Sequence, residues 1–239
     1  MVHKITIHIK TIKKNTRKYF LTISVFIITI SSYSQASPQD KFGAWYMFDG
    51  TLRVLDKLSI KTGIQLRSFE VLDNINLMLY YTGIKYHLSE KTSLTMAYCY
   101  LDIDKTFLIT GENHLYESRP YEQISYKQKI YNFPINHRLR LEHRFLNYKQ
   151  QLTTLHKFRY RIGTKINLNK TFFIKVNEEV FMNTKNQVFT ENRLFAALGY
   201  QLSKSSNIQL GYLNHEINKQ NLNRLQVGFF IKTDLKKKK

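Results

Sequence analysis

Arginine and glutamate recur at every second position in the middle of the sequence, and these side chains are suited to charge-based chemistry. Arg138, Arg140, Glu142 and Arg144 alternate with apolar residues, and the pattern resumes further along the chain. The candidate site residues are Arg138, Arg140, Glu142, Arg144, Arg159, Arg161, Glu179 and Arg193. Guanidinium groups bind carboxylates and other anions through charge-assisted hydrogen bonds. The set therefore predicts an interior charge network.

The position of the turn before Glu179 predicts which residue lies opposite it on the neighbouring strand. If a hairpin closes at Asn169, one register sets Glu179 opposite Arg161 and the next sets it opposite Arg159. Either register gives the carboxylate a guanidinium partner across the strands. Glu178 then points to the other face, unless a β-bulge at 178 and 179 or a position near a rim changes its surroundings.

Two interpretations of this charged set stay open. In the first, interleaved arginine and glutamate fill the interior of a protein with satisfied charge and have a structural role. In the second, six arginines for two glutamates line a narrow, anion-preferring channel or a binding cavity for a small anionic solute. Neither interpretation calls for a cofactor or a metal ion, and none is expected.

Catalysis is the rival class. Outer-membrane lipases, acyltransferases and proteases place Ser, His and acidic residues near one rim, and the candidates here are His114, Ser118, His137, His143 and His215. A nucleophile and its base must lie within hydrogen-bond reach, and the sequence assembles no such set and no GxSxG, HExxH or P-loop motif. The catalytic residues stay unknown, and a lipid-modifying hydrolase or acyltransferase is the alternative function.

The elements that position these residues are β-strands. Apolar and polar residues alternate from Phe42 onward, as in Leu139, Leu141, His143 and Phe145, which puts one apolar row on one face. No stretch has a comparable helical period, so the fold class is all-β. The strand candidates are 42–50, 58–69, 75–88, 91–102, 117–131, 135–147, 155–168, 171–182, 191–203, 206–216 and 223–234.

The connections between these candidates alternate in length. Short turns fall at 89–90, 132–134, 169 and 204–205, and longer polar loops fall at 103–116, 148–154, 183–190 and 217–222. This alternation, together with strands of roughly 10 residues and aromatic residues near strand ends, is typical of transmembrane barrels whose short turns are periplasmic. The prediction is an antiparallel transmembrane up-and-down β-barrel of about 10 to 12 strands.

The number of candidate strands is odd, whereas single-chain bacterial barrels have even numbers. Either a strand between Lys41 and Lys57 is miscounted, or the N-terminal segment adds one.

Residues 1–36 contain no acidic residue and include an apolar run at 19–30, followed by small residues up to Ala36. This pattern predicts a secretory signal peptide cleaved after Ala36, with a short membrane anchor as the alternative. Residues 37–239 then form the outer-membrane barrel domain, for which outer-membrane lipid and the barrel-assembly machinery are the expected partners.

The chain has 37 basic and 17 acidic residues and a formal net charge of +20. Its single cysteine, Cys99, excludes intramolecular disulfides and cysteine-rich zinc sites. A basic, aromatic-rich β-protein is one candidate for nucleic-acid binding. The cations are spread along most strands, however, and the leader predicts export, so nucleic acid is not an expected partner.

Several segments occur in an order that resembles a known family. They are RPYEQISY at 119–126, LRLEHRF at 139–145, FRYRIG at 158–163, VNEEVFMN at 176–183, FTENRLFAALGYQL at 189–202 and IQLGYLN at 208–214. Together they resemble the uncharacterised outer-membrane family known as domain of unknown function 2490, over essentially the whole mature chain. The resemblance implies an outer-membrane β-barrel and no particular activity.

Overall fold

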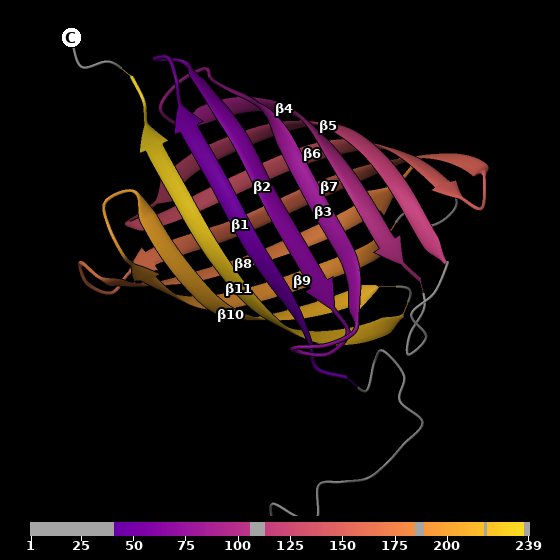
Figure 1. The fold of residues 1–239 in the computed structure, drawn as a ribbon. Coiled ribbons are helices and arrows are strands. Elements are labelled where there is room, and N and C mark those ends of the chain that lie inside the picture. The colour runs from indigo at the N-terminus through magenta and orange to yellow at the C-terminus, as the bar shows by residue number, and fades with distance from the viewer. Residues whose placement is uncertain (1–40, 106–112, 185–188, 218, 237–239) are drawn as a thin grey trace, which may run out of the picture. The chain divides into compact units, whose positions relative to one another are not determined.

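The computed structural model describes residues 41–105, 113–184, 189–217 and 219–236. The predicted signal peptide, residues 1–36, lies outside these ranges. Within them, no helix is long and apolar enough to cross a membrane. The strands are β1 (Gly43–Arg53), β2 (Leu58–Ser68), β3 (Ile75–His87), β4 (Thr92–Asp104), β5 (His114–Ile130), β6 (Phe133–Tyr148), β7 (Gln151–Asn167), β8 (Phe172–Asn183), β9 (Phe189–Gln201), β10 (Ser206–Ile217) and β11 (Gln220–Asp234) (Figure 1).

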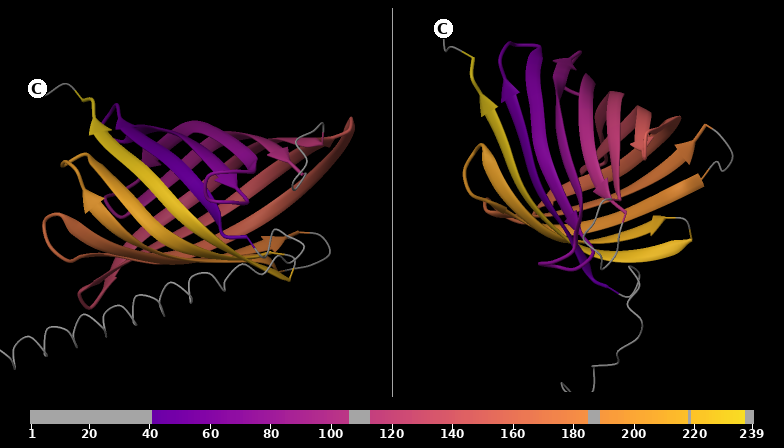
Figure 2. Two further views of the ribbon diagram at one scale, coloured as in Figure 1. Left: turned by 60° about the horizontal axis from the view of Figure 1, so that its bottom comes forward. Right: turned by 45° about the vertical axis from the view of Figure 1, so that its right-hand side comes forward.

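The strands form one closed barrel in which each strand pairs with its neighbours along the chain, and β1 pairs with β11 (Figures 1 and 2). The closing pair is parallel and runs the full length of β1, from Gly43 opposite Arg224 to Arg53 opposite Asp234. All other pairs are antiparallel. The predicted all-β barrel and its number of strands are confirmed.

The parallel pair also explains the odd number of strands. Of the two alternatives for the odd number, a miscounted strand between Lys41 and Lys57 is wrong, because β1 is one continuous strand there. The other, a strand added by the N-terminal segment, concerns residues outside the described ranges. A barrel with an odd number of up-and-down strands must close with its first and last strands parallel. The barrel therefore begins at one rim, at Gly43, and ends at the other rim, at Asp234.

These two rims differ in their connections. We call the rim where β11 ends the C-terminal rim; its connections are residues 54–57, 88–91, 131–132, 168–171 and 202–205. We call the rim where β1 begins the N-terminal rim; its connections are residues 69–74, 105–113, 149–150, 184–188 and 218–219. Every connection of the C-terminal rim has four residues or fewer, whereas those of the N-terminal rim reach nine.

Two of the long loops predicted for the N-terminal rim are instead strand. At 148–154, β6 and β7 continue outward and join through Lys149 and Gln150, whose φ angles are 48° and 64°. At 217–222, β10 and β11 likewise continue to a two-residue connection. Polar residues that resemble a loop in sequence form a hairpin here because their backbone groups still pair across the two strands.

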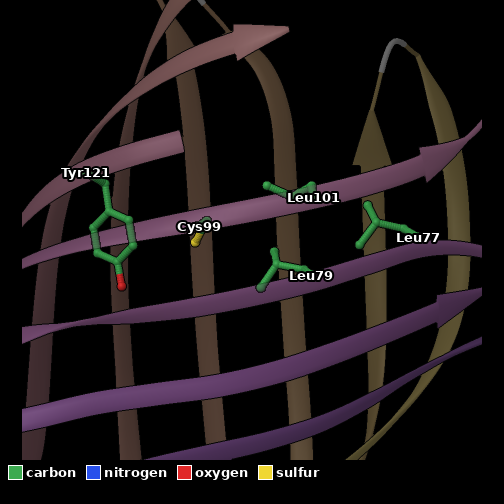
Figure 3. Packing of buried hydrophobic residues seen from close by; sticks show 5 residues of the cluster. All are labelled: Leu77, Leu79, Cys99, Leu101 and Tyr121. Carbon is green, nitrogen blue, oxygen red and sulfur yellow. The ribbon is translucent and has the colours of Figure 1, made fainter. Parts of the chain in front are cut away.

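The alternation of side chains sorts them between the inside and the outside of the barrel. On β9, Phe195 and Ala197 are 3% and 5% exposed, whereas Leu194 and Leu198 are 50% and 51% exposed. The buried row faces the lumen and the exposed apolar row faces outward. One apolar cluster lines the lumen on three neighbouring strands (Figure 3); it comprises Leu77, Leu79, Cys99, Leu101 and Tyr121.

Some inward positions are glycine because a ring from the next strand lies over them. Gly199 is opposite Phe173 and Gly63 is opposite Tyr81. A Cβ atom at Gly199 would lie 2.0 Å from the Phe173 ring, and one at Gly63 would lie 2.5 Å from the Tyr81 ring. Glycine thus lets large side chains lie flat against the inner wall.

Candidate functional site

The predicted charged residues lie on the inward-facing rows of β6, β7, β8 and β9. Arg138 is opposite Arg161, Arg161 is opposite Glu179, and Glu179 is opposite Arg193. Of the two registers of β7 and β8 that the sequence allowed, the structure therefore has the one with Glu179 opposite Arg161, and not the one with Glu179 opposite Arg159. Arg138 on β6 also reaches Glu179 on β8, past the intervening β7, at 2.5 Å. Such a contact is made on the concave side of the wall, where alternate strands approach each other.

Arg159 joins two of the buried glutamates. Its Nε donates to Glu179 at 2.8 Å, and its Nη1 donates to Glu142. Glu142 is 1% exposed and also lies 3.4 Å from Nη1 of Arg140 and 3.6 Å from Nη1 of Arg119. Each carboxylate is thus surrounded by guanidinium groups, which is the condition under which a buried charge is tolerated.

A third glutamate extends this network toward the N-terminal rim. Glu117 has no exposed surface. It accepts two hydrogen bonds from Arg144, at 2.6 and 2.8 Å, and one from Arg119, at 2.6 Å. The paired contact with Arg144 is bidentate, a geometry that fixes the orientation of both groups. Among the described residues, ion pairs link the predicted residue Arg144 to the others through Glu117 and Arg119.

A fourth glutamate, Glu191 on β9, forms a second cluster and is opposite Phe181 in register. Glu191 lies 3.2 Å from Nζ of Lys157 and 2.6 Å from Nε2 of His215, and it also pairs with Arg193. The predicted residue Arg193 thus has Glu191 as its ion-pair partner, although Glu179 is opposite it in register.

Aromatic rings connect the two clusters. The guanidinium carbons of Arg159 and Arg193 lie 4.5 and 4.4 Å from the centroid of the Phe181 ring. Arg193 also lies 4.9 Å from the Trp45 ring, and Arg67 lies 3.8 Å from that ring. Cation–π contacts of this kind stabilise desolvated cations. We call the charged residues of the two clusters together the arginine–glutamate network. It comprises Glu117, Arg119, Arg138, Arg140, Glu142, Arg144, Lys157, Arg159, Glu179, Glu191, Arg193 and His215.

Sequence reasoning missed Glu117, Arg119, Lys157 and Glu191. Glu117 and Arg119 share the inward row of β5 with the aromatic Tyr121, so that row does not resemble a polar face. The available signal was the alternation itself, which assigns Glu117 and Arg119 to one face of β5. Arg161 is the predicted residue with the weakest link to the network, since it is opposite Glu179 while Arg138 and Arg159 take the short contacts.

Glu178 lies on the outer face, as strict alternation requires. Both alternatives considered for Glu178 are wrong: the register between β8 and β9 shifts at Phe181 and Met182 and not at 178 and 179, and Glu178 lies in the middle of β8 and not near a rim. Asn192, also outward, donates a hydrogen bond to Glu178 at 3.1 Å. Glu178 therefore has a polar partner on the outer wall.

The histidines and serine considered for catalysis lie apart from one another. His114 contacts Asp102 at 2.5 Å, and Ser118 bonds to Tyr98 at 2.8 Å. His137 contacts Tyr160 at 2.7 Å, and His215 belongs to the Glu191 cluster inside the lumen. His143 faces outward and joins Glu122 and His156, at 3.1 and 2.8 Å.

One serine–histidine pair that the sequence did not suggest lies at the C-terminal rim. Oγ of Ser59 is 2.8 Å from Nε2 of His87, which is the distance that a nucleophile and its base require. Ser59 is only 1% exposed, however, so a substrate has no open approach to Oγ. This pair therefore gives no support to a hydrolase or an acyltransferase.

Lysines occupy the inner rows near the C-terminal rim. Each lies within three residues of the strand end at that rim, and we call the group the lysine half of the lumen: Lys61, Lys85, Lys127, Lys165, Lys175 and Lys232. The inward acids at this level are Asp49 and, at the end of β11, Asp234. Asp49 lies 3.2 Å from Lys61, and Asp234 lies 3.8 Å from Lys236 of the C-terminal tail.

A cavity of about 640 Å³ opens at the C-terminal rim beside the lysine half. Its charged lining residues are Lys165, Lys170, Lys204 and Lys232, and no acidic residue within the described ranges lines it. Two turns shape its edge. Oδ1 of Asn169 accepts hydrogen bonds from backbone N–H groups of Thr171 and Phe172. No group of His, Cys, Asp and Glu side chains in the described part of the chain is arranged to hold a metal ion.

At the same rim, residues that follow β11 contact the end of β1 and the connection after it. The backbone N–H of Leu235 donates to the carbonyl of Arg53 at 2.8 Å, and Nζ of Lys236 lies 2.8 Å from the carboxylate of Asp56. The hydrogen bond from Lys236 lowers the pKa of Asp56, and the same bond raises the pKa of Lys236. Asp56 is exposed, so this pair is expected to add little stability.

A closed β-barrel with an apolar outer wall and buried arginine and glutamate inside defines the structural class of this protein. The family model described as protein of unknown function (DUF2490) matches residues 42–226. The chain belongs to this family, as the resemblance indicated. A comparison with curated proteins finds no match.

Proposed function

We propose that this protein is an integral β-barrel of a Gram-negative outer membrane, with a lumen closed by the arginine–glutamate network and a cationic chamber that binds a small anionic solute. The observation that carries the proposal is the distribution of side chains between the two faces of the wall. Charged residues fill much of the lumen, and large apolar residues cover most of the outside, where Glu122 and Glu178 are exceptions with polar partners.

The outer wall supports the membrane part of this proposal. Outward side chains such as Met96, Leu198 and Leu210 are 67%, 51% and 55% exposed. A barrel in water would expose its polar rows and bury these residues. Outward tyrosines and phenylalanines, such as Tyr126 and Phe145 with 41% and 46% exposure, suit the interface between lipid and water.

The burial of the inward side chains supports the proposal that the lumen is closed. The four glutamates of the network, Glu117, Glu142, Glu179 and Glu191, are at most 8% exposed. Water therefore reaches these carboxylates hardly at all, which is unlike the wide aqueous channel of a porin. The inward apolar cluster of β3, β4 and β5 fills more of the lumen (Figure 3).

Export through a cleaved leader, residues 1–36, and insertion by the barrel-assembly machinery belong to the same proposal. The short connections of the C-terminal rim would then face the periplasm. The parallel closure implies that Gly43 lies at the opposite rim from Asp234 in that orientation.

A substitution on the outer wall tests the membrane assignment. Leu210 lies between Leu198 and Val227, both apolar and outward. An arginine facing lipid costs about 2–4 kcal/mol near the bilayer midplane. We expect Leu210→Arg to reduce several-fold the amount of heat-modifiable, folded protein in the outer-membrane fraction.

Thr153→Arg is the matched control, since Thr153 lies in the exposed start of β7 beyond the apolar belt. We expect its folded yield to equal that of the wild type. Equal yields for Leu210→Arg and Thr153→Arg would contradict a lipid-facing wall.

A further inference from the structure

The lysine half of the lumen carries charge that the protein itself does not neutralise. Among the described residues, Lys61 is the one lysine of this group that forms an ion pair, with Asp49. The hydroxyl of Tyr81 bonds to the same oxygen of Asp49, Oδ2. The other five lysines have no carboxylate partner in the described part of the chain.

Two of these lysines directly face each other. Lys165 on β7 is opposite Lys175 on β8. Like charges in this position are destabilising. Their contacts are with neutral groups: Nζ of Lys175 donates to Gln209 at 3.2 Å, and Nζ of Lys165 lies 3.6 Å from the centroid of the Phe173 ring. An anion bound at the two ammonium groups, on the lumen side of the wall, would offset the repulsion.

The cavity at the C-terminal rim offers room for such an anion. It adjoins the pair through Lys165 and reaches Lys232, and its volume of about 640 Å³ suits a small molecule. Lys170 and Lys204 add cations from the two turns at its edge. Neutral hydrogen-bonding residues complete the lining, among them Asn167, Gln201 and Asn207.

We propose that this cavity binds a phosphate group of a phosphorylated ligand, held mainly by Lys165 and Lys232. A phosphate suits the site better than a single carboxylate. It carries more charge to set against several lysines, and its oxygens accept hydrogen bonds from both ammonium and amide groups. The phosphate has two sources: a soluble phosphate ester that enters from water, or the headgroup of a lipid at the rim.

This inference deepens the proposed function and rests on it for the compartment that the rim faces. The test uses the complete protein folded in uncharged maltoside micelles, so that binding is measured apart from membrane insertion. Inorganic pyrophosphate is the probe, titrated calorimetrically at low and at high salt. We expect saturable binding that weakens with salt, because ammonium–phosphate attraction is screened.

The double variant Lys165→Gln with Lys232→Gln, which removes both main contacts, is expected to bind pyrophosphate at least about tenfold more weakly, a loss of about 1.4 kcal/mol of binding free energy. The matched control is Lys149→Gln with Lys219→Gln, which removes the same charge at the N-terminal rim and should bind like the wild type. Equal weakening by both variants would mean non-specific attraction to a basic protein, and this result or absent binding by the wild type would overturn the proposal.

A second variant tests the cavity without a substitution in a strand, in case the first variant does not fold. Lys170→Gln with Lys204→Gln changes only exposed turn residues, so the barrel wall is untouched. It should still weaken pyrophosphate binding several-fold, and unchanged binding by a folded form of this variant would count against the cavity.

The source of the phosphate is identified in nanodiscs. The comparison is made at high salt, which screens the negative surface charge of the lipid. If a lipid headgroup occupies the site, phosphatidylglycerol nanodiscs will still lower the apparent pyrophosphate affinity of the wild type relative to maltoside micelles, and the Lys165→Gln, Lys232→Gln variant will not bind the lipid phosphate. If the ligand is soluble, the affinity at high salt will be the same in both. A poor folded yield of the wild type in membranes, with normal binding in micelles, would count against the proposed function alone.

Discussion

The two halves of the lumen contain similar numbers of cations in very different surroundings. In the arginine–glutamate network, carboxylates on β5, β6, β8 and β9 lie among guanidinium groups and are almost fully buried. In the lysine half, Asp49 is paired and the remaining lysines meet amides, rings and one another. The difference indicates that charge stabilises the wall in the network, and it is the basis for the proposal that the lysine half binds an anionic ligand.

The largest effect is expected when the network loses a carboxylate. Glu142→Gln keeps the shape of the side chain but removes the negative charge between Arg119, Arg140 and Arg159. Breaking a buried ion pair in this way leaves uncompensated charge and costs about 3–5 kcal/mol. We expect the urea midpoint of unfolding to fall accordingly. The single tryptophan, Trp45, reports unfolding because it is buried against Arg67.

Asp56→Asn is the control for that measurement. Asp56 lies in the connection 54–57 of the C-terminal rim, its side chain is 89% exposed, and its ion-pair partner is Lys236. Removing its charge should leave the unfolding free energy nearly unchanged, because exposed ion pairs contribute little to stability. If both variants lose the same unfolding free energy, the buried carboxylates contribute no more to stability than an exposed carboxylate does.

A smaller effect is expected from the rings that cations contact. Phe181→Leu and Phe173→Leu remove similar volumes from side chains that are 1% and 2% exposed. Phe181 contacts Lys157, Arg159 and Arg193, whereas the Phe173 ring has Lys165 as its nearby cation. We expect Phe181→Leu to cost about 1 kcal/mol more in unfolding free energy, from the additional cation–π contacts. Equal costs would show that packing alone stabilises both rings.

Much of the fold follows from the sequence because the alternation of side chains is a local property. The charged row of β6 was predicted on residue types alone, since Arg138 to Arg144 alternate with leucine and phenylalanine. The outward direction of Glu178 also followed from alternation. The hairpin at Lys149 did not, because polar residues in a strand that extends beyond the apolar belt resemble those of a loop.

The closure of the barrel and the composition of its two halves were not predictable in the same way. Whether β1 meets β11 in parallel depends on a pairing between the two ends of the chain, which no local pattern encodes. The lysines share a level only because the registers of many strand pairs bring them together, and an error of one residue would move a lysine to the outer face. The contact of Arg159 with Glu179 is diagonal, so register alone favours Arg161 as the partner.

The smallest effect is expected in the lysine half, and it has the opposite sign. Lys175→Gln removes one charge of the Lys165–Lys175 pair, and Gln can still hydrogen-bond to Gln209. Relief of like-charge repulsion between directly opposite residues should raise the unfolding free energy by about 0.2–1 kcal/mol. The gain should shrink as sodium chloride is added, because salt screens the repulsion in the wild type. Lys149→Gln, at the far rim, should show neither the gain nor its salt dependence. A loss of stability as large as that of Glu142→Gln would mean that Lys175 has a structural role, and the two halves of the lumen would then not differ in the way that their contacts indicate.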